Sequence, residues 1–489
     1  MTNHEESDRP VPGRRVFCNR TLNLRAIRAV GFDMDYTLVH YRTEAWEERA
    51  YEHARQRLLA LGWPLADAVF DPELATLGLV FDTESGNLVK ADRFGYVKRA
   101  MHGTRMLSFE EQRQVYAGVL VDLAEPRFRL MSTLFALSEA CLYAQTVDLF
   151  DARRLPGIMG YGGLYDKVRR SLDAVHAEGE LKAEIIAAPA TFVEADPALA
   201  LTLKDLRAAG KKVLLITNSD WAYTQAMMGL VFGAAPDASR GWRTLFDMVI
   251  VSARKPEFFS QPNPLFEVVS PEGLLRPAAG GLAAGGVYWG GDAATVEKHL
   301  GLSGAEILYV GDHIFSDVHV SKSLLRWRTA LVVREIEDEV AALAAFQGEQ
   351  RALDGLMHDK EAIERRYTRL RLELLRREGG YDGVSEASAA ALKEELQALR
   401  AELSEMDDKI APLARRASEL ANPRWGLLMR AGNDKSLLAR QIERYADIYT
   451  SRVSNLGACT PFAYLRAPRG SLPHDMDADR GSVEAATGE

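Results

Sequence analysis

Short apolar runs recur along the chain, and each of them ends in polar residues. They occupy 27–34, 211–219, 247–256, 305–317 and 327–333. Runs this short and rich in β-branched residues are typical of strands buried on both faces of a sheet. Because helical patterns separate them, we predict a doubly wound α/β unit with a parallel, Rossmann-like sheet. The Gly/Ala-rich stretch 276–292 is expected to form a surface loop in this unit.

The region between the first two runs is mostly helical in pattern. Helical periodicity covers 44–62, returns at 109–123 and continues through 168–185. Between the first two of these stretches, 77–103 alternates around the turn sequence "SGN" and predicts a β-hairpin. We therefore expect a helical body that contains one hairpin.

A heptad-like pattern follows the last strand run. Its stronger stripe consists of Leu392, Leu396, Leu399, Leu403, Met406, Ile410 and Leu413. A weaker stripe precedes a Gly-rich break at 377–383 and consists of Leu356, Ile363, Tyr367, Leu370 and Leu374. Two stripes separated by a break predict an antiparallel, coiled-coil-like helical hairpin. Its charges fit a solvated helix face better than a nucleic-acid surface.

The composition narrows the functional class. At 489 residues, 47% hydrophobic and 26% charged, the chain is expected to fold into two to four globular units. The net charge of −9 argues against a nucleic-acid or anionic-membrane partner. Cys18, Cys141 and Cys459 are scattered, which favours unpaired thiols in a reducing compartment. Since we find no signal core and no spanning segment, we expect a cytoplasmic protein.

The polar residues that end the strand runs have unusual chemistry. They are Asp33, Asp35, Thr217, Asn218, Ser219, Lys255, Asp312 and Asp317. In open α/β sheets, ligands bind outside the carboxyl ends of the strands, so these side chains should converge. Several carboxylates in one crevice need a countercharge, and oxygen donors without His or Cys favour Mg²⁺ over Zn²⁺.

The same set predicts phosphoryl transfer. A lysine together with hydroxyl and amide donors can hold a phosphate, and with Mg²⁺ they neutralise its transition state. One Asp can then act as the nucleophile and form an acyl phosphate, while its neighbour two residues on shuttles the proton.

These motifs resemble the haloacid dehalogenase superfamily, whose first motif is matched by "DMDYTL" at 33–38. Within it, the chain resembles the cytosolic purine 5′-nucleotidase family, the IMP/GMP-preferring type and its relatives. The resemblance rests on "GFDMDYTL", "TNSDWAYT", "ARKPEFF", "ILYVGDHIFSD", "WRTALVV", "RYADIYTSRVSNL" and "PFAYLRAPRGSLPHD". It covers roughly residues 15–475.

The resemblance implies a catalytic role for each strand-end residue. Asp33 would be the nucleophile, and Asp35 would protonate the leaving oxygen and then activate water. Thr217 and Asn218 would bind the transferred phosphoryl group, and Lys255 would neutralise the nucleophile and phosphate.

The resemblance also implies a metal site and further substrate contacts. Asp312 would ligate Mg²⁺ together with Asp33 and the backbone carbonyl of Asp35. Asp317 would support the metal shell, and Ser219 is counted with the substrate-binding residues.

By the same resemblance, the long insertion between the first two motifs is a cap that carries a nucleoside pocket. The matching positions are Phe135, Arg169, Asp173, His176 and Lys182. Arg169, Asp173 and His176 lie at helical spacing and share one helix face. The chain departs from the purine-specific pattern at Ala136 and Ala177, which leaves the purine preference open.

The expected fold is thus a HAD-like α/β core with an inserted, mostly helical cap and a C-terminal helical hairpin. The expected parts are a flexible arm, a core in two segments, the cap, the hairpin, a C-terminal segment packed on the core and a disordered tail: 1–20, 21–45 with 186–345, 46–185, 346–420, 421–475 and 476–489.

The leading functional hypothesis is a Mg²⁺-dependent 5′-nucleotidase that forms an aspartyl phosphate. A nucleoside phosphotransferase or another HAD phosphomonoesterase would use the same residues. A catalytically silent scaffold, assembled through the helical hairpin, is the alternative of a different class. The family resemblance and the heptad stripe also favour a homo-oligomer, although the stripe can equally close within one chain.

Overall fold

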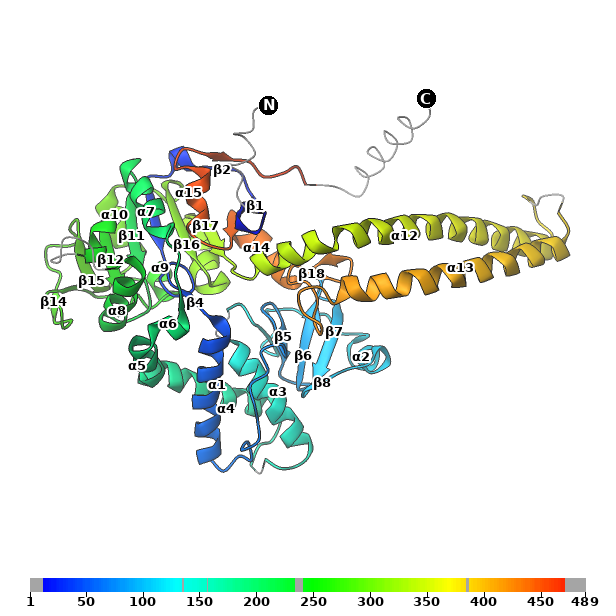
Figure 1. The fold of residues 1–489 in the computed structure, drawn as a ribbon, viewed down its shortest axis with the longest axis horizontal. Helices are drawn as coiled ribbons and strands as arrows, with labels where there is room; N and C mark the ends of the chain where they lie inside the picture. Colours follow the sequence, from blue (N-terminus) through cyan, green and yellow to red (C-terminus); the bar gives the residue numbers. More distant parts are fainter. Residues whose placement is uncertain (1–11, 134–135, 156, 234–240, 384–386, 471–489) are drawn as a thin grey trace. The chain divides into compact units, whose positions relative to one another are not determined.

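The computed structural model describes residues 12–133, 136–155, 157–233, 241–383 and 387–470 (Figure 1). The chain divides into two compact units, each built from separate segments. Unit 1 consists of 1–49, 175–334 and 440–489, and unit 2 of 50–174 and 335–439. Among the helices in the described ranges, none is both long and apolar enough to cross a membrane. The expected disordered tail at 476–489 lies outside the described residues.

Unit 1 is built on a large, mostly parallel sheet. Within the described residues it has ten strands in the order β1-β20-β17-β16-β3-β11-β12-β15-β13-β14. The parallel strands are β3 (Ala29–Phe32), β11 (Lys212–Ile216), β12 (Met248–Val251), β15 (Gly286–Gly290), β16 (Ile307–Gly311), β17 (Arg328–Val332) and β20 (Ile448–Thr450). Antiparallel strands at the two edges are β1 (Val16–Cys18), β13 (Leu265–Val268) and β14 (Leu275–Pro277). The expected α/β core with a parallel sheet is confirmed.

Both faces of this sheet are covered. Leu214 and Ile216 of β11 belong to a buried cluster that also contains Phe258 and Phe259, while their alternating neighbours in the strand are equally buried. The helices of this unit include α7 (Leu199–Ala208), α8 (Trp221–Phe232), α9 (Glu257–Ser260), α10 (Ala293–Leu300), α11 (Val320–Leu325), α14 (Leu437–Tyr445, at the unit boundary) and α15 (Asn455–Cys459). Burial on both faces explains why the strand runs read as continuously apolar.

Two expectations for this unit were wrong. The predicted surface loop at 276–292 contains β15, which pairs in parallel with β12. Its three central residues, 287–289, are apolar, but glycines at both ends hid the strand signal. Part of the expected flexible arm at 1–20 is strand β1, whose antiparallel partner is the distant β20. Local pattern cannot reveal a partner so far along the chain.

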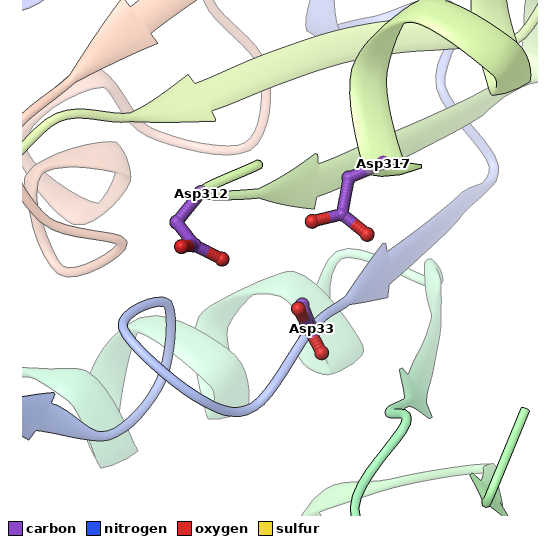
Figure 2. Close-up of side chains that lie close together, drawn as sticks. All are labelled: Asp33, Asp312 and Asp317. Carbon is purple, nitrogen blue, oxygen red and sulfur yellow. The ribbon is translucent and has the colours of Figure 1, made fainter. Parts of the chain in front are cut away.

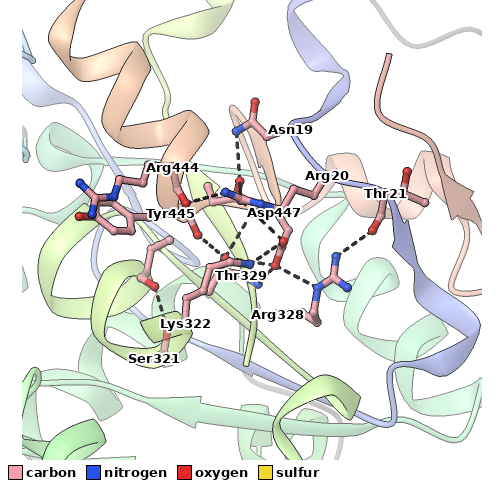
Figure 3. A network of polar contacts seen from close by, with 12 residues as sticks. Asn19, Arg20, Thr21, Ser321, Lys322, Arg328, Thr329, Arg444, Tyr445 and Asp447 are labelled. Carbon is pink, nitrogen blue, oxygen red and sulfur yellow. Dashed lines mark hydrogen bonds and ion pairs between the residues drawn. The ribbon is translucent and has the colours of Figure 1, made fainter. Parts of the chain in front are cut away.

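The last sheet strand is held by a network of charges around Asp447 (Figure 3). The Asp447 carboxylate lies 2.6 Å from Lys322 Nζ and 3.0 Å from Arg328 Nε. It also accepts a hydrogen bond from the backbone N–H of Thr329 at 3.0 Å. Burial would raise the pKa of Asp447, but Lys322 and Arg328 hold that pKa below its ordinary value. The network therefore fixes the start of β20 beside β17.

Unit 2 contains an antiparallel sheet of its own. Its five strands within the described residues are, in order, β8 (Arg105–Met106), β7 (Val97–His102), β6 (Asn87–Ala91), β5 (Val80–Asp82) and β9 (Phe128–Leu130). The predicted hairpin at 77–103 is thus part of a larger sheet. The sequence pattern did not indicate the additional strands β8 and β9 because they are too short to show alternation. The helical expectation at 109–123 holds only for α2 (Phe109–Tyr116), and α3 (Leu137–Asp151) follows β9.

The same unit carries two long helices, α12 (Ile336–Gly379) and α13 (Ala389–Ser418), which run side by side (Figure 1). Cross-helix pairs show that they are antiparallel: Glu349 with Arg416, Lys360 with Asp407 and Arg366 with Glu395. Residues from both helices, including Leu353, Met406 and Ile410, form one apolar cluster. The predicted helical hairpin is confirmed.

Two helices carry the chain between the two units, and several short elements of unit 1 precede or follow them in the sequence. Helix α1 (Thr43–Ala60) and helix α4 (Tyr161–Glu178) cross the boundary between the units. Within unit 1, β4 (His40–Tyr41) pairs antiparallel with β10 (Val193–Glu194), and α5 (Glu180–Ala187) and α6 (Pro189–Phe192) precede β10.

Candidate active site

The carboxyl ends of β3, β11, β12 and β16 meet at one edge of the sheet in unit 1. Phe32 at the end of β3 is in register with Val310 on one side and Leu215 on the other. The chain order reverses across β3, because β11 lies on one side of it and β16 on the other. Such a reversal is the place where open α/β sheets bind ligands. Asp33, the next residue of the chain, lies there.

Lys255 joins two carboxylates at this edge. Its Nζ lies 2.8 Å from Asp33 Oδ2 and 2.7 Å from Asp317 Oδ1. It also donates a hydrogen bond to the hydroxyl of Tyr309 at 3.1 Å. Burial alone would lower the pKa of Lys255, but Asp317 and Asp33 raise that pKa well above its ordinary value. The lysine is therefore held as a buried cation.

Asp312 joins the two carboxylates that pair with Lys255 to form a cluster of three acids (Figure 2). Oxygen atoms of Asp33, Asp312 and Asp317 all lie within 4.8 Å of one another. Burial raises the pKa of Asp33 to about 6, with Lys255 opposing and Asp317 adding to the shift. Burial, followed by repulsion from Asp317 and Asp33, raises the pKa of Asp312 well above its ordinary value. One ammonium group cannot balance three carboxylates, so the cluster fits a further cation, and its all-oxygen donor set suits Mg²⁺.

Asp317 reaches the cluster because of its local backbone. It lies on a π-helical turn, Ile314–His319, and its Oδ2 accepts a hydrogen bond from the backbone N–H of His313 at 3.2 Å. A Cβ at Gly311 would lie only 2.6 Å from the same Oδ2, so any other residue there would displace the carboxylate. The glycine of the "GD" motif therefore makes room for Asp317.

The polar turn after β11 fixes the backbone around Lys255. The Oδ1 atom of Asn218 accepts a hydrogen bond from Lys255 N at 2.6 Å, and its Nδ2 donates one to Lys255 O at 3.1 Å. Thr217 Oγ1 accepts a hydrogen bond from Ser219 N at 3.1 Å. These residues thus form one rigid wall beside the carboxylates, although Asn218 contacts the Lys255 backbone rather than its ammonium.

Asp35 faces a different set of partners from Asp33. Its Oδ1 accepts a hydrogen bond from the hydroxyl of Tyr41 at 2.5 Å, and its Oδ2 accepts one from Ser219 Oγ at 2.7 Å. Burial raises the pKa of Asp35, and the Tyr41 hydrogen bond opposes this shift. The two acids of the "DMD" motif therefore occupy separate environments.

Lys182 lies on the Asp35 side of the site. Its Nζ is 3.5 Å from Asp220 Oδ2 and 4.9 Å from the ring centre of Tyr223. Its charge also favours the ionised form of Asp35, so it lowers the pKa of that carboxyl. Lys182 and Asp35 therefore lie close enough within unit 1 for their charges to interact.

The other residues predicted for the nucleoside pocket are divided between the two units. Arg169 belongs to unit 2, where its side chain pairs with Glu139 at 2.9 Å and Asp173 at 3.1 Å. His176 belongs to the segment of unit 1 that begins at 175, and Phe135 lies outside the described residues. Their common nucleoside pocket stays a prediction.

Three tyrosines of the site were missed by sequence analysis. Tyr309 lies within the apolar run of β16, Tyr41 ends β4, and Tyr223 lies on α8. Their hydroxyls all make hydrogen bonds, including one from Tyr309 to Ile216 O at 3.0 Å. A tyrosine in a buried run reads as an ordinary apolar residue, so only the hydroxyl partners show its role.

The chain matches known proteins over nearly its whole length. A family model described as the 5′ nucleotidase family matches residues 16–477. A 5′-nucleotidase domain-containing protein of Dictyostelium discoideum is 28% identical over 475 residues, covering 94% of this chain and 75% of that protein. The 5′-nucleotidase domain-containing protein 2 of Homo sapiens is 27% identical over 463 residues, covering 90% and 81%.

Among solved structures, a haloacid dehalogenase-like family hydrolase from Xanthomonas campestris is similar at a TM-score of 0.25. It is 14% identical, with 65% of this chain and 95% of that chain covered. A TM-score this low carries no argument about function. The family model spans every strand-end residue of the candidate site. The chain belongs to the 5′-nucleotidase family.

Proposed function

We propose that this protein is a Mg²⁺-dependent phosphomonoesterase that hydrolyses nucleoside 5′-monophosphates through an aspartyl phosphate. The observation that carries the proposal is the chain of ion pairs from Asp33 through Lys255 to Asp317, with Asp312 beside it. A purely structural ion pair does not require a third and a fourth buried charged group at the same place.

Asp33 has the environment expected of a nucleophile. Its side chain lies at the carboxyl end of β3, and the buried Lys255 holds one of its oxygens. The backbone N–H of Met34 donates a hydrogen bond to the other oxygen at 2.7 Å. These two donors orient the carboxylate for attack on phosphorus and would balance part of the charge of the incoming phosphate.

Asp35 would act as the acid and base. It would give a proton to the leaving nucleoside oxygen when the phosphoryl group moves to Asp33. It would then take a proton from the water that attacks the acyl phosphate, which restores Asp33 and releases phosphate. The proton balance closes over the two steps, so no further proton carrier is required.

The carboxylates of Asp33 and Asp312, with the backbone carbonyl of Asp35, would hold Mg²⁺, and Asp317 would support them from the side of Lys255. When bound, the metal supplies positive charge to the phosphate oxygens. The substrate class rests on family membership and on Lys182, whose ammonium group lies on the side of Asp35, where the leaving group would sit.

The test is a screen of the purified protein with Mg²⁺ against nucleoside 5′-monophosphates and small phosphate esters. Release of phosphate from one or more nucleotides supports the proposal, and the ranking of bases decides whether purines are preferred. Added nucleoside shows whether a second alcohol replaces water as the acceptor. Preference for sugar phosphates over every nucleotide contradicts the nucleotide assignment.

Asp33→Asn identifies the nucleophile. We expect a loss of activity on the order of 10⁴-fold or more, since the covalent route is removed. Asp408→Asn, an exposed site on α13, is the matched control and should keep full activity. Labelled phosphate trapped on the wild type by acid quenching, and absent from Asp33→Asn, would show the acyl phosphate. Equal activity in Asp33→Asn and wild type would disprove the mechanism.

A further inference from the structure

Two buried tyrosines lie behind Asp35, and the proposed reaction as described so far does not use them. Tyr41 ends β4 and is 3% exposed, while Tyr223 lies on α8 and is 2% exposed. Their hydroxyl oxygens are 3.0 Å apart, and the Tyr41 hydroxyl is 2.5 Å from Asp35 Oδ1. The three groups thus form a chain of hydrogen bonds that ends on the acid of the site.

The number of available protons determines which group donates in each of these hydrogen bonds. An ionised Asp35 can only accept, so the single proton of Tyr41 goes to Asp35 Oδ1. The contact between the two phenols then requires Tyr223 to donate to Tyr41. Hydrogen bonds aligned in one direction strengthen one another, so Tyr223 reinforces the bond from Tyr41 to Asp35.

The two oxygens of Asp35 therefore have unequal partners. Oδ1 is bound by a phenol whose only proton is committed to it. Oδ2 faces Ser219 Oγ at 2.7 Å, and a serine hydroxyl can turn between donating and accepting. A change of protonation at Oδ2 can thus be followed by rotation of one hydroxyl, whereas a change at Oδ1 would break the tyrosine chain.

We propose that Tyr41 and Tyr223 are positioning residues that hold Asp35 by Oδ1 and reserve Oδ2 for proton transfer to and from the substrate. This inference rests on the proposed function. In the first step an Asp33 carboxylate oxygen bonds to phosphorus while the leaving oxygen separates from it, and the Oδ2–H bond breaks as its proton joins that leaving oxygen. In the second step a proton of the attacking water returns to Oδ2, while the water oxygen bonds to phosphorus and the Asp33–phosphorus bond breaks.

The surroundings of Tyr41 support a fixed position for its hydroxyl. Its ring packs against Trp46 at a centroid distance of 4.4 Å and against Tyr36 at 5.1 Å. Its backbone pairs with Val193 of β10. Removing only the hydroxyl therefore leaves the ring held in place, so Tyr41→Phe isolates the bond to Asp35.

The test compares two leaving groups. A nucleoside alkoxide needs a proton to leave, whereas the p-nitrophenolate of p-nitrophenyl phosphate leaves without one. For Tyr41→Phe we expect kcat on the best nucleotide to fall roughly 10- to 100-fold with KM nearly unchanged, part of the ~10²–10⁴-fold that proton transfer contributes. With p-nitrophenyl phosphate, the variant should keep the wild-type rate of the first turnover, seen as a burst of p-nitrophenolate. Tyr223→Phe should show the same pattern with a smaller loss.

Two comparisons keep the test decisive. Tyr288→Phe removes a buried hydroxyl elsewhere in unit 1, one that accepts a hydrogen bond from Ala283 N, and should change neither rate. In an Asp35→Asn background, adding Tyr41→Phe should cost nothing more on the nucleotide. An equal loss on both substrates, or a loss only in KM, would overturn the positioning role. Wild type without activity on any phosphate ester would instead refute the proposed function, so the two failures are distinguishable.

Discussion

Unit 1 contains two buried charge clusters with opposite composition. At the candidate active site, one cation, Lys255, lies among the carboxylates of Asp33, Asp312 and Asp317. At the start of β20, one carboxylate lies among three cations: Asp447 with Arg20, Lys322 and Arg328.

The two clusters differ in how far their excess charge is exposed to solvent. The side chains around Asp447 are 23–39% exposed, so water solvates their extra positive charge while the carboxylate is satisfied by the protein. At the site the Lys255 and Asp317 side chains are at most 2% exposed. The side chain of Asp33 is 13% exposed, so less water reaches the extra negative charge than at Asp447, and burial together with repulsion between the carboxylates raises the pKa of Asp33 and Asp312. A buried excess of charge indicates a ligand, whereas an exposed excess is compatible with a structural role.

Among the changes that test this comparison, removing the central cation of the site should have the largest effect on activity. We expect Lys255→Met to reduce activity on the order of 10²–10³-fold, as for loss of one preorganised group that stabilises the transition state. Steady-state hydrolysis of the best nucleotide measures it. Lys212→Met, at a 53% exposed side chain that pairs with Asp247, is the control and should keep its activity. A Lys255→Met enzyme with wild-type turnover would show that the ion pair is only structural.

The excess negative charge predicts a metal effect on stability. At a Mg²⁺ concentration about 100 times its dissociation constant, the wild type should gain about 2.7 kcal/mol in free energy of unfolding. Asp312→Asn should lose this gain and, without Mg²⁺, be at least as stable as the wild type, because one repelling carboxylate is removed. Urea unfolding with and without Mg²⁺ tests both statements. Samples treated with EDTA, without added Mg²⁺, give the reference. A stabilisation by Mg²⁺ that is preserved in Asp312→Asn would contradict the assignment.

Asp447→Asn should have the opposite signature. It removes the carboxylate that joins β20 to β17, so we expect a loss of roughly 2 kcal/mol in the free energy of unfolding. The gain from Mg²⁺ should stay as in the wild type, since Asp447 belongs to the other cluster. Urea midpoints of the two variants, each with and without Mg²⁺, sharpen the comparison. If Asp447→Asn also abolished the Mg²⁺ gain, the two clusters would not be independent.

The contrast also shows what sequence can reveal. Asp33, Lys255 and Asp312 were predicted because each follows a buried strand, and parallel strands bring their ends to one edge. The helical hairpin was predicted because the apolar positions of a heptad pattern follow one another within a short stretch of sequence. Strand β15 was missed because its glycines resemble a loop, and β1 because its partner lies at the far end of the chain.

The tyrosine chain behind Asp35 was missed for a related reason. Tyr41 and Tyr223 are 182 positions apart, and each alone reads as an apolar residue. The Asp447 network likewise joins residues from three distant segments, so nothing in a local pattern marks it. Long-range polar contacts can therefore be recognised only in the structure, whereas the polar residues that follow buried strands can be recognised from the sequence.

The smallest expected effect is a change in acid stability that separates Asp447 from the site. The folded-state pKa of Asp447 is lowered by Lys322 and Arg328 against the effect of burial. A lowered pKa contributes stability above the unfolded-state value of about 3.9, and this contribution is lost as pH falls through the folded-state value. The wild type should therefore lose stability below about pH 4 more steeply than Asp447→Asn, which has no carboxyl to protonate. Urea midpoints in metal-free buffer from pH 6 down to the acid limit of folding measure both slopes. Parallel slopes would show that Asp447 is not held ionised by its cations, and the contrast between the two clusters would then rest on the site alone.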